Sequence, residues 1–150
     1  MPNLNDVVTL ERTLWGAPSQ SKKKTLQLIS DTVSELYPSY EADQVFSNLV
    51  ERERLGSTGF GNGVAIPHCR LMSCEAPFGL LVKLDEPIEF DALDQKPVDI
   101  VFTLIVPQEA RTEHLQLLSR IAERFNDDAR LKTMRAATTA EDFYSAFIAE

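Results

Sequence analysis

The stretch VDIVFTLIV, residues 98–106, constrains the fold of this chain more than any other segment. Apart from Asp99 and Thr103 it is apolar and rich in β-branched residues, and Pro107 ends it. A run of this kind is typical of a strand that is buried on both faces. Such a strand needs helices on either side of its sheet. The segment therefore predicts an α/β fold with this strand at the centre of the sheet.

Two helices are expected before this strand. Residues 21–37 carry an apolar stripe that Pro38 closes, and its members are Leu26, Ile29, Val33 and Leu36. The next helix is predicted to begin after the capping residue Ser39 and to end at Gly56. Its apolar face consists of Ala42, Val45, Phe46 and Leu49.

Basic residues on these two helices need an explanation. The run Lys22-Lys23-Lys24 falls in the first turn of the first helix, where the helix dipole disfavours cations. We interpret the run either as a solvated helix end or as a docking patch for an acidic partner. On the second helix, Arg52 follows Leu49 by three residues and so lies on the stripe that faces the core. A guanidinium there either meets an anion or turns back to cap the last carbonyls.

Further strands and three more helices complete the pattern. Shorter strands are expected over residues 63–67 and 78–84. Further along the chain, Ile88 and Phe90 alternate with polar residues, as in a half-buried strand. The predicted helix caps are Thr112, Asp127 or Asp128, and Thr139. The apolar faces of the three helices carry Leu115, Leu118, Ile121, Ala122 and Phe125, then Leu131 and Met134, then Phe143, Phe147 and Ile148. This order of elements predicts a single-domain α/β sandwich over residues 1–150, a mixed β-sheet flanked by helices.

The charge balance bears on the kind of partner. The chain holds 15 Lys and Arg against 23 Asp and Glu, a formal net charge of -8. Such a chain is not drawn to phosphate backbones or anionic lipid, so neither nucleic-acid binding nor membrane insertion is expected. No apolar run reaches the roughly 18 residues of a membrane span, and the first residues lack the pattern of a signal peptide. We expect a cytoplasmic protein, in which Cys69 and Cys74 lie too close together to staple the fold.

The segment LGSTGFGNGVAIPHC, residues 55–69, is the first candidate for chemistry. We call residues 57–63 the glycine loop. Its glycines would let backbone amides approach a bound anion, and its hydroxyls would add donors. The spacing is neither that of a P-loop nor that of a dinucleotide-binding turn. The residues expected to line an anion site are Ser57, Thr58, Gly59, Gly61 and Gly63.

The chain has two histidines, and each is a candidate reactive group. His68 directly follows the loop and its apolar neighbours. His114 falls in the first turn of its predicted helix, on the inward side, where the helix dipole favours a neutral imidazole and free amides can meet an anion. A buried structural histidine is the alternative interpretation of both.

These residues together describe an anion site around an imidazole nucleophile. A neutral imidazole attacks phosphorus without a separate base, and the phosphorus–nitrogen bond that it forms is labile. Arg52 and backbone amides would hold the phosphoryl oxygens while charge redistributes. The pattern therefore indicates phosphoryl transfer.

Residues 52–68, RERLGSTGFGNGVAIPH, fit the pattern REXXGSTGXGNGXAIPH. The segment resembles the active-site signature of the mannitol/fructose-type enzyme IIA domains of the bacterial phosphotransferase system. FDALDQKPVDIVFTLIVP, residues 90–107, and the pair His114-Leu115 continue the match, which covers nearly the whole chain. The sequence is most similar to the nitrogen-regulatory enzyme IIA proteins, which are free-standing regulators rather than sugar-transport domains.

The resemblance implies a role for each candidate residue. It implies that His68 accepts a phosphoryl group from a phosphohistidine on a small HPr-like carrier. It implies that His114 supports this group and that Arg52 is the arginine of the site, while Thr58 and Asn62 lie on the loop that shapes it. Regulatory targets such as potassium-uptake proteins, sensor kinases or metabolic enzymes are implied as well, and no cofactor or metal is expected. Cys69 departs from the pattern, since many members have Gly directly after the active histidine.

Three other functions compete with this interpretation. In the first, the same chemistry passes the phosphoryl group to a separate sugar-permease IIB component. In the second, a metal site is built from His68, Cys69, Cys74 and His114, although adjacent His and Cys ligands are uncommon. In the third, the chain is an interaction module without chemistry, and then the glycine loop and the two histidines have no explanation.

Overall fold

The computed structural model describes residues 3–150, except for the side chain of Glu113. Within that range, six strands form one mixed sheet. Its centre is the antiparallel pair of β5 (Phe78–Ile88) and β6 (Val98–Pro107), and β1 (Thr13–Ala17) pairs parallel with the outer side of β5. The central position of the run 98–106, expected from its apolar sequence, is thus confirmed. In the described part of the chain, no helix is long and apolar enough to cross a membrane.

Three short strands on the other side of β6 carry part of the glycine loop and His68. β3 (Val64–Ala65) and β4 (His68–Leu71) both pair parallel with β6, one after the other, with Pro67 between them. In this register His68 lies opposite Leu104. β2 (Gly59–Gly61) turns back antiparallel on β3. His68 therefore begins a strand that forms an edge of the sheet.

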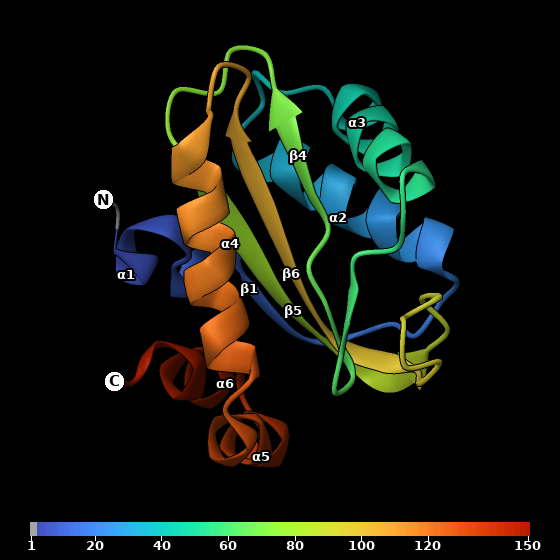
Figure 1. Cartoon of the computed structure of the whole chain (residues 1–150), viewed down its shortest axis with the longest axis vertical. Coiled ribbons are helices and arrows are strands. Elements are labelled where there is room, and N and C mark those ends of the chain that lie inside the picture. The colour runs from blue at the N-terminus through green and yellow to red at the C-terminus, as the bar shows by residue number, and fades with distance from the viewer. Residues whose placement is uncertain (1–2) are drawn as a thin grey trace.

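Helices cover both faces of the sheet (Figure 1). One face is covered by α2 (Lys22–Leu36) and α3 (Ala42–Arg54). The opposite face is covered by α1 (Leu4–Val7), α4 (Thr112–Phe125), α5 (Asp128–Ala136) and α6 (Ala140–Ile148). A 3₁₀ turn, η1 (Leu10–Arg12), leads into β1. The predicted α/β sandwich with a mixed sheet is confirmed.

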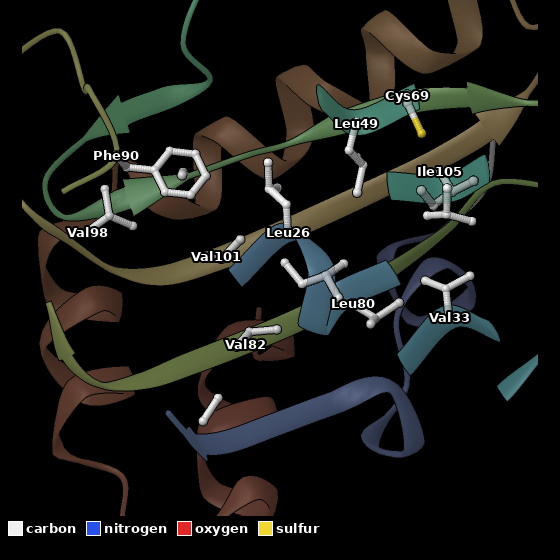
Figure 2. Packing of buried hydrophobic residues seen from close by; sticks show 14 of the residues in the cluster. Leu26, Val33, Leu49, Cys69, Leu80, Val82, Phe90, Val98, Val101 and Ile105 are labelled. Carbon is white, nitrogen blue, oxygen red and sulfur yellow. The ribbon is translucent and has the colours of Figure 1, made fainter. Parts of the chain in front are cut away.

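Each face of the sheet has its own hydrophobic core, because side chains alternate along β5 and β6. Figure 2 shows Leu80, Val82 and Val101 packed beneath Leu26 of α2 and Leu49 of α3. The intervening side chains face α4, α5 and α6, where the rings of Phe102, Phe125 and Phe147 contact one another with centroids 5.2 to 6.4 Å apart. The sheet is therefore held in place by helices from both directions.

The predicted helix caps are partly confirmed. Asp127 and Thr139 each accept a hydrogen bond of 3.1 Å from the amide three residues on. The predicted cap Ser39 is wrong: it lies in a turn closed by the bond from the Tyr40 amide to the Tyr37 carbonyl, and α3 begins only after Glu41. The predicted cap Thr112 is wrong as well, since it is already the first helical residue.

Short elements escaped the sequence patterns. The strands β1, β2 and β4 and the helix α1 contain five residues or fewer, too few for a periodicity to show. The inward face of α4 also differs from the predicted stripe by a small rotation. Leu117 is fully buried, whereas Leu115 is 59% exposed.

The neighbours Leu117 and Leu115 of α4 provide a test of this packing. Leu117→Ala should lower the free energy of unfolding by about 2 to 5 kcal/mol, because it leaves a cavity in the core. Leu115→Ala should change it by less than about 0.5 kcal/mol. Urea denaturation of both variants measures the difference. Equal losses would contradict the orientation of α4.

Candidate functional site

A cleft of about 480 Å³ opens beside the edge strand β4, between α3 and the beginning of α4. Its position follows from the topology, because β4 pairs with β6 and with no other described strand. Figure 1 shows α3 and α4 on either side of this strand. The side chains of both helices can therefore reach its edge. The lining residues are Asn48, Glu51, Arg52, Leu55, His68, Cys69, Arg70, Val106, Gln108 and His114.

The half-buried ring of His68 is held at both nitrogens. Its Nδ1 lies 2.9 Å from the carbonyl oxygen of Ile66, which can only accept, so Nδ1 carries the proton. Its Nε2 accepts a hydrogen bond of 3.2 Å from Nε of Arg52. The unprotonated Nε2 is therefore the nucleophilic atom of the ring.

The surroundings of His68 favour its neutral form. Burial lowers the pKa of His68 below its ordinary value of 6.5, and the Arg52 guanidinium and the His114 ring lower the pKa further. The hydrogen bond to the Ile66 carbonyl acts in the opposite direction. At pH 7 the imidazole is thus neutral and keeps a lone pair for an electrophile.

Arg52 reaches His68 from the last turn of α3. It follows Leu49 on the buried stripe of the helix, as the sequence predicts. Its Nη1 donates to the carbonyl of Gly56 at 2.9 Å, while Nε faces the imidazole. The guanidinium therefore binds a carbonyl just beyond the helix end, one of the two roles considered from the sequence, and at the same time contacts the His68 ring.

His114 is the third residue of α4 and lines the cleft together with His68 and Arg52. Its Nδ1 is buried and has no hydrogen-bond partner among the described residues. Arg111 directly precedes α4 and its side chain does not cap the helix, so His114 lies in a first turn where the helix dipole is positive. The helix start thus presents a ring and a positive dipole end to the cleft.

The glycine loop is not among the residues that line this cleft in the described part of the chain. Ser57 donates to the Phe90 carbonyl at 2.9 Å, and the Asn62 amide donates to Asp94 at 3.3 Å. A Cβ on Gly59 would lie 2.6 Å from Ala92. The loop therefore packs closely against residues 90–94.

Gly63 also has a packing role. Its φ of +79° favours glycine, and a Cβ there would lie 2.5 Å from Nη2 of Arg135. The same guanidinium donates to the Asn62 carbonyl and to Asp99. Gly61 is close to Asp94, and Thr58 is bound by Glu53. The structure brings Arg52, His68 and His114 together at one cleft, whereas the predicted loop residues pack against other segments of the chain.

Comparison with known proteins shows the family of this chain. The family described as "Phosphoenolpyruvate-dependent sugar phosphotransferase system, EIIA 2" matches residues 7–150. The chain belongs to this family. A "Nitrogen regulatory protein" of Pseudomonas aeruginosa is 45% identical to this EIIA chain over 148 residues, which are 99% of the chain and 96% of that protein.

Solved structures of similar proteins have the same fold. The nitrogen regulatory protein IIA-Ntr from Neisseria meningitidis has a TM-score of 0.89 and 33% identity, covering 96% of this EIIA chain and 98% of its own. The IIA mannitol protein from Escherichia coli has a TM-score of 0.75 at 15% identity, with 93% and 97% coverage, and so shares the fold. The resemblance noted from the sequence is confirmed.

Sequence reasoning missed the polar residues that connect the walls of the cleft. Asn48, one turn before Arg52 on α3, donates to the Arg70 carbonyl at 3.0 Å. Arg70 in turn donates to the carbonyl of Gln108 at 3.0 Å. The spacing of four residues between Asn48 and Arg52 is the signal that could have indicated their common face.

The two cysteines of this EIIA chain are buried, and Cys69 lines the cleft. Both thiols are free and buried, and burial raises the pKa of Cys69 to about 12. Among the described residues, no three His, Cys, Asp or Glu side chains gather closely enough to hold a metal ion. The alternative metal site that included Cys69 and Cys74 therefore has no support in the structure.

The neutral state of His68 can be tested by NMR. The ring pKa of His68 should lie below 6.5, and Arg52→Gln should raise it, because the substitution removes a neighbouring cation. The chemical shifts of the ring protons, recorded from about pH 4 to about pH 9, give the pKa of His68 in the wild type and in the variant. A pKa that does not move in Arg52→Gln would contradict the contact between the two residues.

The same pKa has a consequence for stability. The unfolded chain binds a proton at His68 more readily than the folded chain, since the folded pKa is lowered. The contribution of His68 to the free energy of unfolding is fully present above its ordinary pKa of 6.5. It is lost as the pH falls through 6.5 and below. In His68→Asn this part of the pH dependence should disappear.

Proposed function

We propose that this protein is a phosphohistidine relay, in which Nε2 of His68 accepts a phosphoryl group from a phosphohistidine on an HPr-like phosphocarrier. The observation that carries the proposal is the orientation of the His68 ring. The Ile66 carbonyl holds the Nδ1 proton, so the Nε2 lone pair turns toward Arg52 and the cleft. The acceptor needs no general base, because Nε2 has no proton to lose.

The transfer exchanges one phosphorus–nitrogen bond for another. The bond from phosphorus to the donor imidazole breaks as the bond to Nε2 of His68 forms, and the donor ring keeps the electron pair. Before transfer, Nε of Arg52 donates a hydrogen bond to Nε2 of His68. As the new phosphorus–nitrogen bond forms, this guanidinium donates to a phosphoryl oxygen instead. His114 of α4 also lines the cleft, and in this proposal its ring and the first amides of the helix support the same oxygens.

Regulation follows from the change of charge at the cleft. A phosphoryl group adds about two negative charges where Arg52 and Arg70 now face the opening. A partner that binds this opening therefore encounters a different surface in each state. We propose regulatory proteins as these partners, in line with the names of the relatives, with potassium-uptake proteins and sensor kinases as candidates. Passage of the group to a separate IIB component is the alternative.

The roles of the two histidines can be separated by substitution. His68→Ala should accept no phosphoryl group from a phosphorylated HPr-like carrier, whereas His114→Ala should still accept one, more slowly or less stably. Labelled phosphate on the wild type should be lost in acid and retained in alkali, as for phosphohistidine. Label that remains on His68→Ala, or that maps to Ser57, Thr58 or Cys69, would overturn the mechanism.

The role of Arg52 can be tested in the same assay. Arg52→Ala should slow the transfer to His68 by about a hundredfold or more, as the loss of one preorganised donor does in other enzymes. Arg52→Lys should restore only part of the rate, because an ammonium cannot make the two-pronged contact of a guanidinium. Thermal melting confirms that each variant is folded. A wild-type rate in Arg52→Ala would exclude the role.

A further inference from the structure

We propose that Glu53 is the positioning residue of this site, because it fixes the turn after α3 on which the Arg52 guanidinium depends. The inference rests on the proposed function of His68 and extends it to a residue that does not touch the acceptor. Arg52 and Glu53 are neighbours at the end of α3, and they hold the following turn from two sides.

Glu53 is a buried carboxylate with a full set of partners. Its side chain is only 6% exposed. Its two oxygens accept from the Thr58 amide at 3.3 and 3.2 Å, and one of them also accepts from the Thr58 hydroxyl. Nζ of Lys22 lies 2.8 Å from the other oxygen. A carboxylate with this many donors is fixed in one place, and so is the backbone that it holds.

Lys22 is placed in α2 to meet this carboxylate. No acidic side chain accompanies it in the first turn of the helix, where the dipole disfavours a cation. Nζ of Lys22 lies 4.9 Å from the centre of the Phe90 ring, in addition to its bond to Glu53. Lys22 therefore belongs to an ion pair within the protein, and neither of the two interpretations of the lysine run, a solvated helix end or a docking patch, applies to it.

The turn at residues 55–58 connects Glu53 to the contact between Arg52 and His68. Nη1 of Arg52 is anchored on the Gly56 carbonyl, and the same guanidinium directs Nε at His68. The backbone of this turn is also held by the bond from the Gly56 amide to the Glu53 carbonyl. The Glu53 carboxylate adds a side-chain hold on Thr58, two residues after the Gly56 carbonyl, and we infer that this hold keeps the carbonyl in line with Arg52. Loss of the Glu53 carboxylate releases the turn, and Arg52 then loses its orientation toward Nε2.

Two other roles for Glu53 would leave different signatures at His68. The Glu53 charge raises the pKa of His68, whereas the charge of Arg52 lowers it more strongly. If Glu53 acted only through its charge, its neutralisation would lower the pKa of His68. If it were only structural, the pKa would not move. If it positions Arg52, the pKa rises, because the cation moves away from the ring.

The test is Glu53→Gln, which keeps the shape of the side chain and removes its charge. We expect a higher pKa of the His68 ring by NMR and a transfer rate reduced about tenfold to a hundredfold, the effect of a misplaced reacting group. The matched control is Asp91→Asn. Asp91 is the second carboxylate near Lys22, at 3.8 Å and 81% exposed, and Asn tolerates its positive φ. Asp91→Asn should change neither measurement.

A double-mutant cycle makes the dependence on Arg52 explicit. In an Arg52→Gln background, Glu53→Gln should no longer raise the pKa of His68, because no guanidinium is left to misplace. A rise of equal size in both backgrounds would overturn the proposal, and so would a fall or no change in the single variant. If Glu53→Gln does not fold, Thr58→Val removes the hydroxyl bond alone and should raise the pKa by a smaller amount.

The outcome is independent of whether His68 is a phosphoryl acceptor. The NMR titration needs no phosphocarrier, so it tests the link from Glu53 to Arg52 and His68 directly. A wild-type protein that takes up no phosphate would contradict the proposed function and leave the titration result unaffected. Normal phosphorylation with an unchanged titration in Glu53→Gln would overturn the positioning role alone.

Discussion

The pairing of an interrupted strand with β6 is the constraint on which the rest of the site depends. β3 and β4 share the same neighbour, and Pro67 separates them, with its carbonyl accepting from the Leu104 amide at 2.9 Å. The register fixes His68 at the start of β4, next to an open edge. Because no further strand pairs with β4 in the described chain, α3 and α4 can both send side chains to that edge.

The sequence was informative wherever the physics is local or periodic. Residues 98–106 identified the central strand by their apolar character alone, and the stripes of α2 and α3 identified their buried faces. Arg52 stood out because a charge interrupts such a stripe. His114 stood out because it begins a helix. These features depend on residues a few positions apart, and the structure places Arg52, His68 and His114 around one cleft.

The contacts of the glycine loop could not be predicted, because they join distant parts of the chain. Arg135 reaches the Asn62 carbonyl across 73 positions, and Ser57 reaches the Phe90 carbonyl across 33. A glycine that leaves room for an anion cannot be distinguished in the sequence from a glycine that leaves room for a distant segment of the same chain. In the structure, Gly59 approaches Ala92 and Gly63 approaches Arg135, two residues of distant segments of the same chain. Glu53 was overlooked for the same reason, since its partner Lys22 lies on another helix.

In the proposed relay, a carbonyl rather than a carboxylate behind His68 suits a phosphoryl group that is passed on. A carboxylate at Nδ1 would fix the same tautomer, but it would also stabilise the imidazolium and make Nε2 more basic. The Ile66 carbonyl fixes the ring with much less negative charge, while burial and Arg52 keep the pKa of His68 low. A less basic nitrogen is a better leaving group. In the proposed relay, the same geometry therefore favours both steps, the uptake of the phosphoryl group by His68 and its release to the next acceptor.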